Sequence, residues 1–177
     1  MTEYRRNFVK GGSYFFTVAL ADRSQHLLVD HIDALRKAFR DVKTLYPFDL
    51  DAMVVLPEHL HCIWTLPTGD ANYPDRWRRI KAAFSRGSPD CNFRSPSKIL
   101  KGKRGIWQRR YWEHTLRNED DWRHHMDYIH YNPMKHQHVA RVIDWPYSTF
   151  HRYVEVGTYT RDWAGSGQAS SGGFGEV

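Results

Sequence analysis

Four segments of the chain have the hydrophobic pattern of β-strands. Residues 14–21 are rich in aromatic and β-branched side chains, which favour extended structure. Residues 50–56 and 59–66 are two apolar runs separated by Pro57-Glu58, a turn signal that predicts a hairpin. Residues 106–116 have the composition of a fourth strand.

Apolar residues at helical spacing predict helices between and after these strands, as Ile32, Leu35 and Phe39 illustrate. The first helix is expected from an Asp30 N-cap to about Tyr46, and the second begins at an Asp75 N-cap. The third is expected from Asn118 to Asn132, where Pro133 follows. A short fourth helix is expected over residues 147–154. Residues 87–105, which contain proline, glycine and several serines, are expected to form a loop.

The order of these elements is β-α-β-β-α-β followed by C-terminal helices. This order predicts an α+β protein with a ferredoxin-like antiparallel sheet of four to five strands and added C-terminal helices. The length of 177 residues suits one domain, which we assign to residues 1–163. Residues 164–177 contain five glycines and three serines and are expected to be a flexible tail.

Composition argues against integral membrane proteins, disulfide-rich proteins and exported proteins. No apolar run approaches the roughly 20 residues that span a bilayer, so we expect no membrane partner. Two cysteines, Cys62 and Cys91, cannot form a disulfide framework. Residues 4–10 resemble a twin-arginine export signal, but the apolar run that follows has only eight residues and is better explained as a strand. We therefore expect a cytoplasmic, nucleoid-associated protein.

Positive charge is concentrated in one part of the chain. The formal net charge is +6 and the sequence pI is about 9.4. Residues 76–110 contain twelve Lys and Arg residues and a single acid, Asp90, a local net charge of +11. Such a field favours a polyanionic partner, although a solvated basic face has the same composition. Four aromatic residues lie among these cations and are expected to stack on unpaired bases: Trp77, Phe84, Phe93 and Trp107.

Two histidines are candidates for metal binding. His59 and His61 lie two residues apart in a predicted strand, so they point to the same face, away from the apolar face formed by Leu60, Cys62 and Trp64. Two adjacent imidazoles can bind a divalent cation. This pattern alone is weak, because paired histidines on a half-exposed strand can also have no chemical role.

A tyrosine and an asparagine share one face of the third predicted helix. Tyr128 and Asn132 are four residues apart, roughly 100° around the helix from the apolar stripe that includes Met126 and Ile129. This position favours a chemical role on a polar face. The spacing is equally compatible with packing, and the neighbouring His130 and Tyr131 are competing candidates.

Two motifs give the chain a family resemblance. PEHLHCIWTLP followed by DYIHYNPMKHQHV closely resembles the REP-associated tyrosine transposases, a branch of the single-tyrosine HUH transposases. The resemblance extends over nearly the whole chain up to about Trp163. The tail from Gly165 onward and the sequence Lys135-His136-Gln137, where Lys-His-Gly is commoner, depart from the family pattern.

The resemblance implies a function and a set of site residues. Tyr128 would attack the DNA backbone and form a 5′-phosphotyrosine intermediate, while His59, His61 and Asn132 would hold Mg²⁺ or Mn²⁺. The implied partner is single-stranded DNA folded into a REP hairpin, bound by a monomer or a homodimer. The expected DNA-binding residues are Arg5, Arg6, Arg78, Lys81, Arg109, Arg110, Lys135 and His136.

Two other functions are compatible with the same residues. One is a non-catalytic, architectural or regulatory hairpin-binding protein derived from a transposase. The other is a metal-dependent phosphodiesterase that uses water and forms no covalent intermediate. The second is disfavoured because a two-histidine-motif phosphoesterase would carry a second HxT or HxS sequence, which this chain lacks.

Overall fold

A computed structural model describes residues 6–88 and 105–165, and these contain one four-stranded antiparallel sheet. The strands are β1 (Ser13–Ala19), β2 (Asp49–Val55), β3 (His59–Thr65) and β4 (Trp112–Thr115), in the spatial order β2-β3-β1-β4. Helices α1 (Leu27–Asp30) and α2 (Ile32–Leu45) connect β1 to β2, and α3 (Tyr73–Gly87) follows β3. The predicted β-α-β-β-α-β order and the ferredoxin-like α+β class are confirmed.

Two of the predicted helix caps are wrong by a few residues. Asp30 ends the short α1, and α2 begins after His31. Helix α3 begins earlier than expected because the Asn72 side chain accepts a hydrogen bond from the Asp75 amide. Asp75 therefore lies in the first turn, after Pro74, where an acidic residue favours the positive end of the helix dipole.

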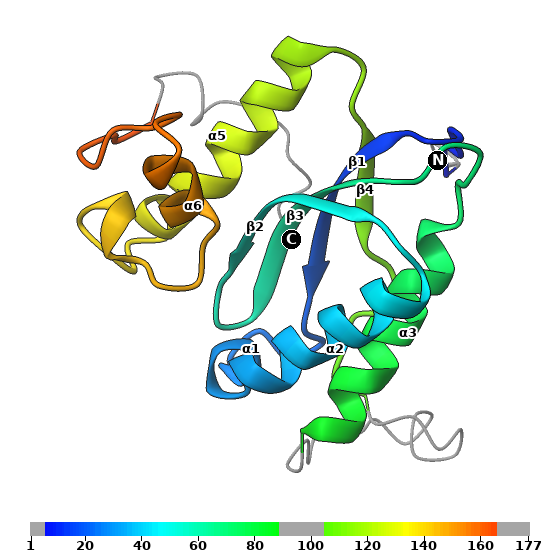
Figure 1. Ribbon diagram of the computed structural model, residues 1–177. Coiled ribbons are helices and arrows are strands. Elements are labelled where there is room, and N and C mark those ends of the chain that lie inside the picture. The colour runs from blue at the N-terminus through cyan, green and yellow to red at the C-terminus, as the bar shows by residue number, and fades with distance from the viewer. Residues whose placement is uncertain (1–5, 89–104, 166–177) are drawn as a thin grey trace, which may run out of the picture.

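One face of the sheet packs against α2 and α3 (Figure 1). Trp64 of β3 stacks on Trp77 of α3 with ring centroids 4.4 Å apart, and Phe16 packs edge-on against Trp77. Trp77 and Phe84 are fully buried in this core, so the expectation that they stack on bases is wrong. Helical spacing placed both rings on the inward face of α3, and burial of that face takes them away from DNA. Phe93 lies outside the described residues.

The opposite face of the sheet packs against α5 (Glu119–Lys135), with the 3₁₀ turn η1 (Val142–Asp144) and α6 (Phe150–Glu155) beside it (Figure 1). The predicted cap is confirmed, because the Asn118 side chain accepts a hydrogen bond from the Asp121 amide at 2.9 Å. The helix continues through Pro133 to Lys135, past its predicted end. A proline removes one backbone hydrogen bond, and burial of the Pro133 ring against the rest of the protein offsets that loss.

The fourth strand is shorter than predicted. Leu20 forms an isolated bridge with Trp107, and regular pairing with β1 resumes at Trp112. The break leaves Arg109 and Arg110 exposed beside the edge of the sheet. Most of the predicted 87–105 loop and of the tail after residue 163 lies outside the described residues. Within the described parts, no helix is both long enough and apolar enough to cross a bilayer.

Candidate functional site

The two histidines of β3 lie side by side in the interior, between the sheet and α5. Their rings are 4.9 Å apart, and the exposed fractions of His59 and His61 are 3% and 1%. The Nδ1 atom of His61 pairs with the Thr17 hydroxyl of β1 at 2.8 Å, and Nδ1 of His59 pairs with a Glu58 carboxylate oxygen at 2.9 Å. These partners fix both ring orientations, which is the usual arrangement of histidines that bind a metal through the other nitrogen.

Tyr128 of α5 lies next to this histidine pair. Its ring centroid is 5.2 Å from that of His61, and its side chain is fully buried. The expectation that Tyr128 lies on a polar face is therefore wrong. The Tyr128 ring faces the sheet, where it also packs edge-on against Phe15 of β1 at 6.0 Å. Another face of α5 contacts the C-terminal segment, where the Tyr159 hydroxyl donates to Asp127 at 2.5 Å. A single apolar stripe consequently underestimates how much of α5 is buried.

Asn132 lies one helical turn beyond Tyr128 and is also fully buried. Neither its carboxamide oxygen nor its nitrogen has a well-formed hydrogen bond within the described residues, and the Nε2 atom of His61 has none either. Buried polar atoms are normally paired, so unpaired ones at one place require an explanation. All three atoms belong to side chains next to Tyr128, and they are suited to an additional ligand.

The protonation states of the site match a cation-binding role. Burial, followed by the nearby His59, lowers the pKa of His61 well below its ordinary value, so its imidazole is neutral. Burial alone would raise the pKa of Glu58, but the hydrogen bond and charge of His59 lower it to about 2. The site therefore combines a neutral imidazole with a nearby carboxylate. His59, His61 and Asn132 together offer a nitrogen and oxygen donor set that fits a divalent cation.

The Tyr128 phenol is protonated at neutral pH. Burial raises its pKa to about 12, and the interaction with the Asn132 side chain opposes that increase. The Lys135 ammonium lies over the Tyr128 ring, 5.1 Å from its centroid. Such a cation stabilises negative charge that develops on the phenol oxygen. The phenol would therefore have to lose its proton before it could act as a nucleophile.

The expected DNA-binding residues fall into separate groups. Lys135 and the exposed His136 lie at the histidine pair, where the His136 ring is 5.2 Å from that of His59. Arg6 and Lys81 lie over the Tyr111 ring at 4.6 and 5.1 Å, away from the α5 side of the sheet.

The other expected DNA-binding residues differ in their surroundings. Arg78 is exposed and forms an ion pair with Asp75, and Arg109 and Arg110 are exposed at the break before β4. Arg5 lies outside the described residues. Arg76, which contributes to the basic stretch, is 4% exposed and binds backbone carbonyls, so it is structural.

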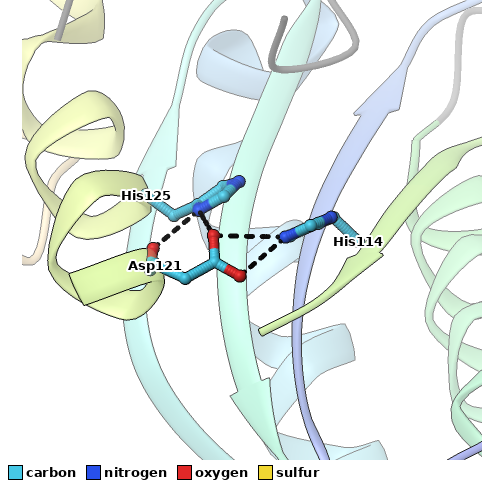
Figure 2. Close-up of side chains that lie close together, drawn as sticks. All are labelled: His114, Asp121 and His125. Atoms are coloured by element: carbon cyan, nitrogen blue, oxygen red, sulfur yellow. Dashed lines mark hydrogen bonds and ion pairs between the residues drawn. The ribbon is translucent and has the colours of Figure 1, made fainter. Parts of the chain in front are cut away.

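A second cluster of potential ligands lies further toward the start of α5 and was not predicted from the sequence. His114 of β4 meets Asp121 and His125 of α5, as Figure 2 shows. The only sequence signal is the spacing of Asp121 and His125, four residues apart on one helix face. His114 lies in the predicted strand just before this helix, seven residues from Asp121, but the sequence does not show that its side chain points toward them.

The fold and the site define an α+β protein in which one helix brings a tyrosine and a carboxamide to a pair of histidines on an antiparallel sheet. No protein-family model matches the chain. A REP-associated tyrosine transposase of Escherichia coli (strain K12) is 51% identical over 165 residues, which cover 93% of this chain and 92% of that protein. A Haemophilus influenzae protein described under the same family name is 44% identical over 94% of this chain and 95% of its own length.

The similarity extends to three dimensions. A solved structure of a REP-associated tyrosine transposase bound to a REP hairpin matches this fold with a TM-score of 0.85 and 48% identity, covering 100% of this chain and 98% of that one. The chain therefore belongs to the family of REP-associated tyrosine transposases.

Proposed function

We propose that this chain cuts and rejoins single-stranded DNA beside REP-type hairpins, with Tyr128 as the nucleophile and His59, His61 and Asn132 as ligands of Mg²⁺ or Mn²⁺. The observation that carries the proposal is the position of Tyr128. Its ring lies 5.2 Å from that of His61, whose buried Nε2 atom has no hydrogen-bond partner among the described residues. A related transposase has been solved with a REP hairpin bound, which supports this substrate.

The proposed reaction is a transesterification. The Tyr128 oxygen attacks phosphorus and loses its proton, the bond from phosphorus to the 3′ oxygen breaks, and that oxygen leaves as a 3′-hydroxyl. A 5′-phosphotyrosine remains, and a DNA 3′-hydroxyl can later attack it and release Tyr128. A bound divalent cation would polarise the phosphate oxygens. The chain's own contribution is to hold the phenol in place and to stabilise its anion with Lys135.

DNA would be held by cations, some of which surround a half-buried aromatic ring. Arg6 and Lys81 surround the half-buried Tyr111 ring, and burial lowers the pKa of Lys81 to about 8. We propose that this cluster and the exposed Arg109 and Arg110 contact the phosphate backbone. Lys135 and His136 would contact the phosphate at the point of cleavage.

Trapping the covalent intermediate tests the proposal. Labelled REP-type hairpin DNA is incubated with protein and Mn²⁺ and analysed on a denaturing gel, where we expect a band shifted by covalently attached protein. The band should disappear in Tyr128→Phe and persist in Tyr131→Phe, which removes a neighbouring hydroxyl. It should also disappear when EDTA is added and return with excess Mn²⁺.

Two results would favour the other functions. Tight hairpin binding with neither cleavage nor a covalent band would indicate a non-catalytic binding protein. Cleavage that persists in Tyr128→Phe would indicate a phosphodiesterase that uses water. Either result would refute the proposed role of Tyr128.

A further inference from the structure

His114, Asp121 and His125 form a compact cluster at the junction between β4 and α5 (Figure 2). The Nε2 atom of His114 is 2.9 and 3.2 Å from the two Asp121 carboxylate oxygens, and Nδ1 of His125 is 3.1 Å from one of them. One ligand atom from each residue lies within 4.8 Å of the other two. Within residues 6–88 and 105–165, no other group of three His, Cys, Asp or Glu residues converges in this way.

The chemistry of the cluster matches a transition-metal site. Two imidazole nitrogens and one carboxylate oxygen are borderline ligands that bind Zn²⁺ and its neighbours, with further positions left for water. The exposed side-chain fractions are 8% for His125, 20% for Asp121 and 23% for His114. The ligands are therefore mostly buried, yet the cluster is open enough for an ion to enter from solvent.

The Asp121 carboxylate is held in place by two donors, the Nε2 atom of His114 and the backbone amide of Arg117. The Arg117 amide donates to Asp121 at 3.0 Å and fixes the orientation of the carboxylate.

Binding of an ion requires both histidines to give up a hydrogen bond, since the Nε2 atom of His114 donates to the Asp121 carboxylate. The Nδ1 atom of His125 lies 2.7 Å from the Asp121 backbone carbonyl, to which it donates in the metal-free state. An ion would replace that proton, and the lost hydrogen bond would be compensated by a metal–nitrogen bond. The stacked His114 and His125 rings, 4.7 Å apart, would open slightly to admit it.

We propose that His114, Asp121 and His125 form a second divalent-metal site of the zinc type, which fastens β4 to the first turns of α5. Its residues are separate from those of the proposed catalytic site. The Phe15 ring lies between the two sites, 4.8 Å from the His125 ring and 6.0 Å from that of Tyr128. An ion at this junction would therefore fix the start of the helix that carries Tyr128 and Asn132.

Metal titration in the absence of the β3 histidines tests this site. The protein is prepared without an affinity tag, carries His59→Ala and His61→Ala, and is stripped with a chelator. Titration with Co²⁺, followed by visible absorption, and calorimetry with Zn²⁺ should each give one bound equivalent. The equivalent should be lost when His114→Gln or Asp121→Asn is added. It should persist when His26→Gln is added, because His26 is exposed and distant in the fold.

Thermal unfolding provides a second measurement. Zn²⁺ should raise the Tm of the His59→Ala/His61→Ala protein and leave the Tm of its Asp121→Asn derivative unchanged, since a ligand stabilises only the state that binds it. If the His59→Ala/His61→Ala protein bound no metal, the proposal would be overturned. The three residues would then join β4 to α5 by hydrogen bonds alone. An equivalent that survives both His114→Gln and Asp121→Asn would overturn it as well. Both results are independent of Tyr128 chemistry.

Discussion

At the scale of single residues, the candidate site depends on side chains that hold other side chains in place. Thr17 and His61 are directly opposite each other on neighbouring strands, so the threonine hydroxyl reaches Nδ1 of His61 at 2.8 Å. Glu58 does the same for His59 from the turn before β3. Each partner leaves the second ring nitrogen available for a ligand.

The Thr17 hydroxyl should affect metal affinity without being a ligand. Thr17→Val removes the hydrogen bond and keeps the shape of the side chain, so His61 loses its fixed orientation. We expect the Mn²⁺ concentration that gives half-maximal covalent adduct to rise about 10- to 100-fold. Thr17→Ser keeps the hydroxyl and should resemble the unmodified protein. Equal Mn²⁺ dependence for both variants would exclude a role for this hydrogen bond.

The pKa of Tyr128 predicts the pH dependence of adduct formation. Burial raises that pKa to about 12, so at neutral pH almost all of the phenol is protonated. Below its pKa, the phenolate fraction rises about tenfold for each pH unit, and single-turnover adduct formation should rise with pH in the same proportion between about pH 7 and pH 9. A rate that is flat or falls over this range would show that deprotonation of Tyr128 does not limit the reaction.

At the scale of secondary-structure elements, Arg76 joins α3 to the end of α2. Its guanidinium is 4% exposed and donates to the carbonyls of Tyr46, Pro47 and Asn72 and to the Asp70 carboxylate at 2.6–3.2 Å. One basic side chain therefore satisfies acceptors from two parts of the chain, residues 46–47 and residues 70–72. Arg76 therefore has a structural role, although the sequence alone counted it among the basic residues expected to attract DNA.

Loss of Arg76 should destabilise the fold. Arg76→Met leaves several buried acceptors without a donor, and we expect the free energy of unfolding to fall by about 3 kcal/mol. Arg78→Met is a matched control on the same helix, because Arg78 is exposed and pairs only with Asp75, so its effect should stay within about 0.5 kcal/mol. Urea denaturation of both variants measures the difference, and equal midpoints would contradict this role.

The sequence predicted the helices and strands better than the burial and the contacts of their side chains. Aromatic and β-branched composition in β1 and helical spacing in α2 were sufficient to predict these elements, and alternation along β3 predicted the direction of His59 and His61. Burial of Tyr128 could not be predicted, because it comes from packing against Phe15 of β1 and His61 of β3, which lie far from α5 in the sequence. The meeting of His114 with Asp121 likewise depends on the tertiary position of β4.

At the scale of the whole molecule, the sheet separates two different surfaces. The α2 and α3 side contains the larger hydrophobic core, whereas the α5 side contains the histidine pair, Tyr128 and Asn132 (Figure 1). Positive charge is present on both sides. A lysine or arginine can contact DNA bound at Tyr128 only if it lies on a suitable side of the sheet. The number of cations in the sequence does not show this.

Salt dependence should distinguish cations that contact DNA from those that do not. Replacing Arg109 and Arg110 with alanine should weaken hairpin binding and reduce the slope of log affinity against log salt by about 1 to 2, because fewer counterions are released. Replacing Lys37 and Arg40 removes the same charge from α2, a helix to which we assign no DNA contact, and should change the slope much less. An unchanged slope in the Arg109/Arg110 variant would refute phosphate contacts by this pair.

The placement of α5 predicts that one chain forms a complete site. Tyr128 contacts His61 of its own chain, with ring centroids 5.2 Å apart, so no exchange of helices between chains is required. A mixture of Tyr128→Phe protein with His59→Ala/His61→Ala protein should therefore stay inactive in the covalent-adduct assay. If instead α5 of one chain completed the site of another, the mixed dimers would contain one intact site and restore about a quarter of the activity. Light scattering on the same samples shows whether dimers are present. If the mixture contains dimers and is still inactive, the site is formed within one chain.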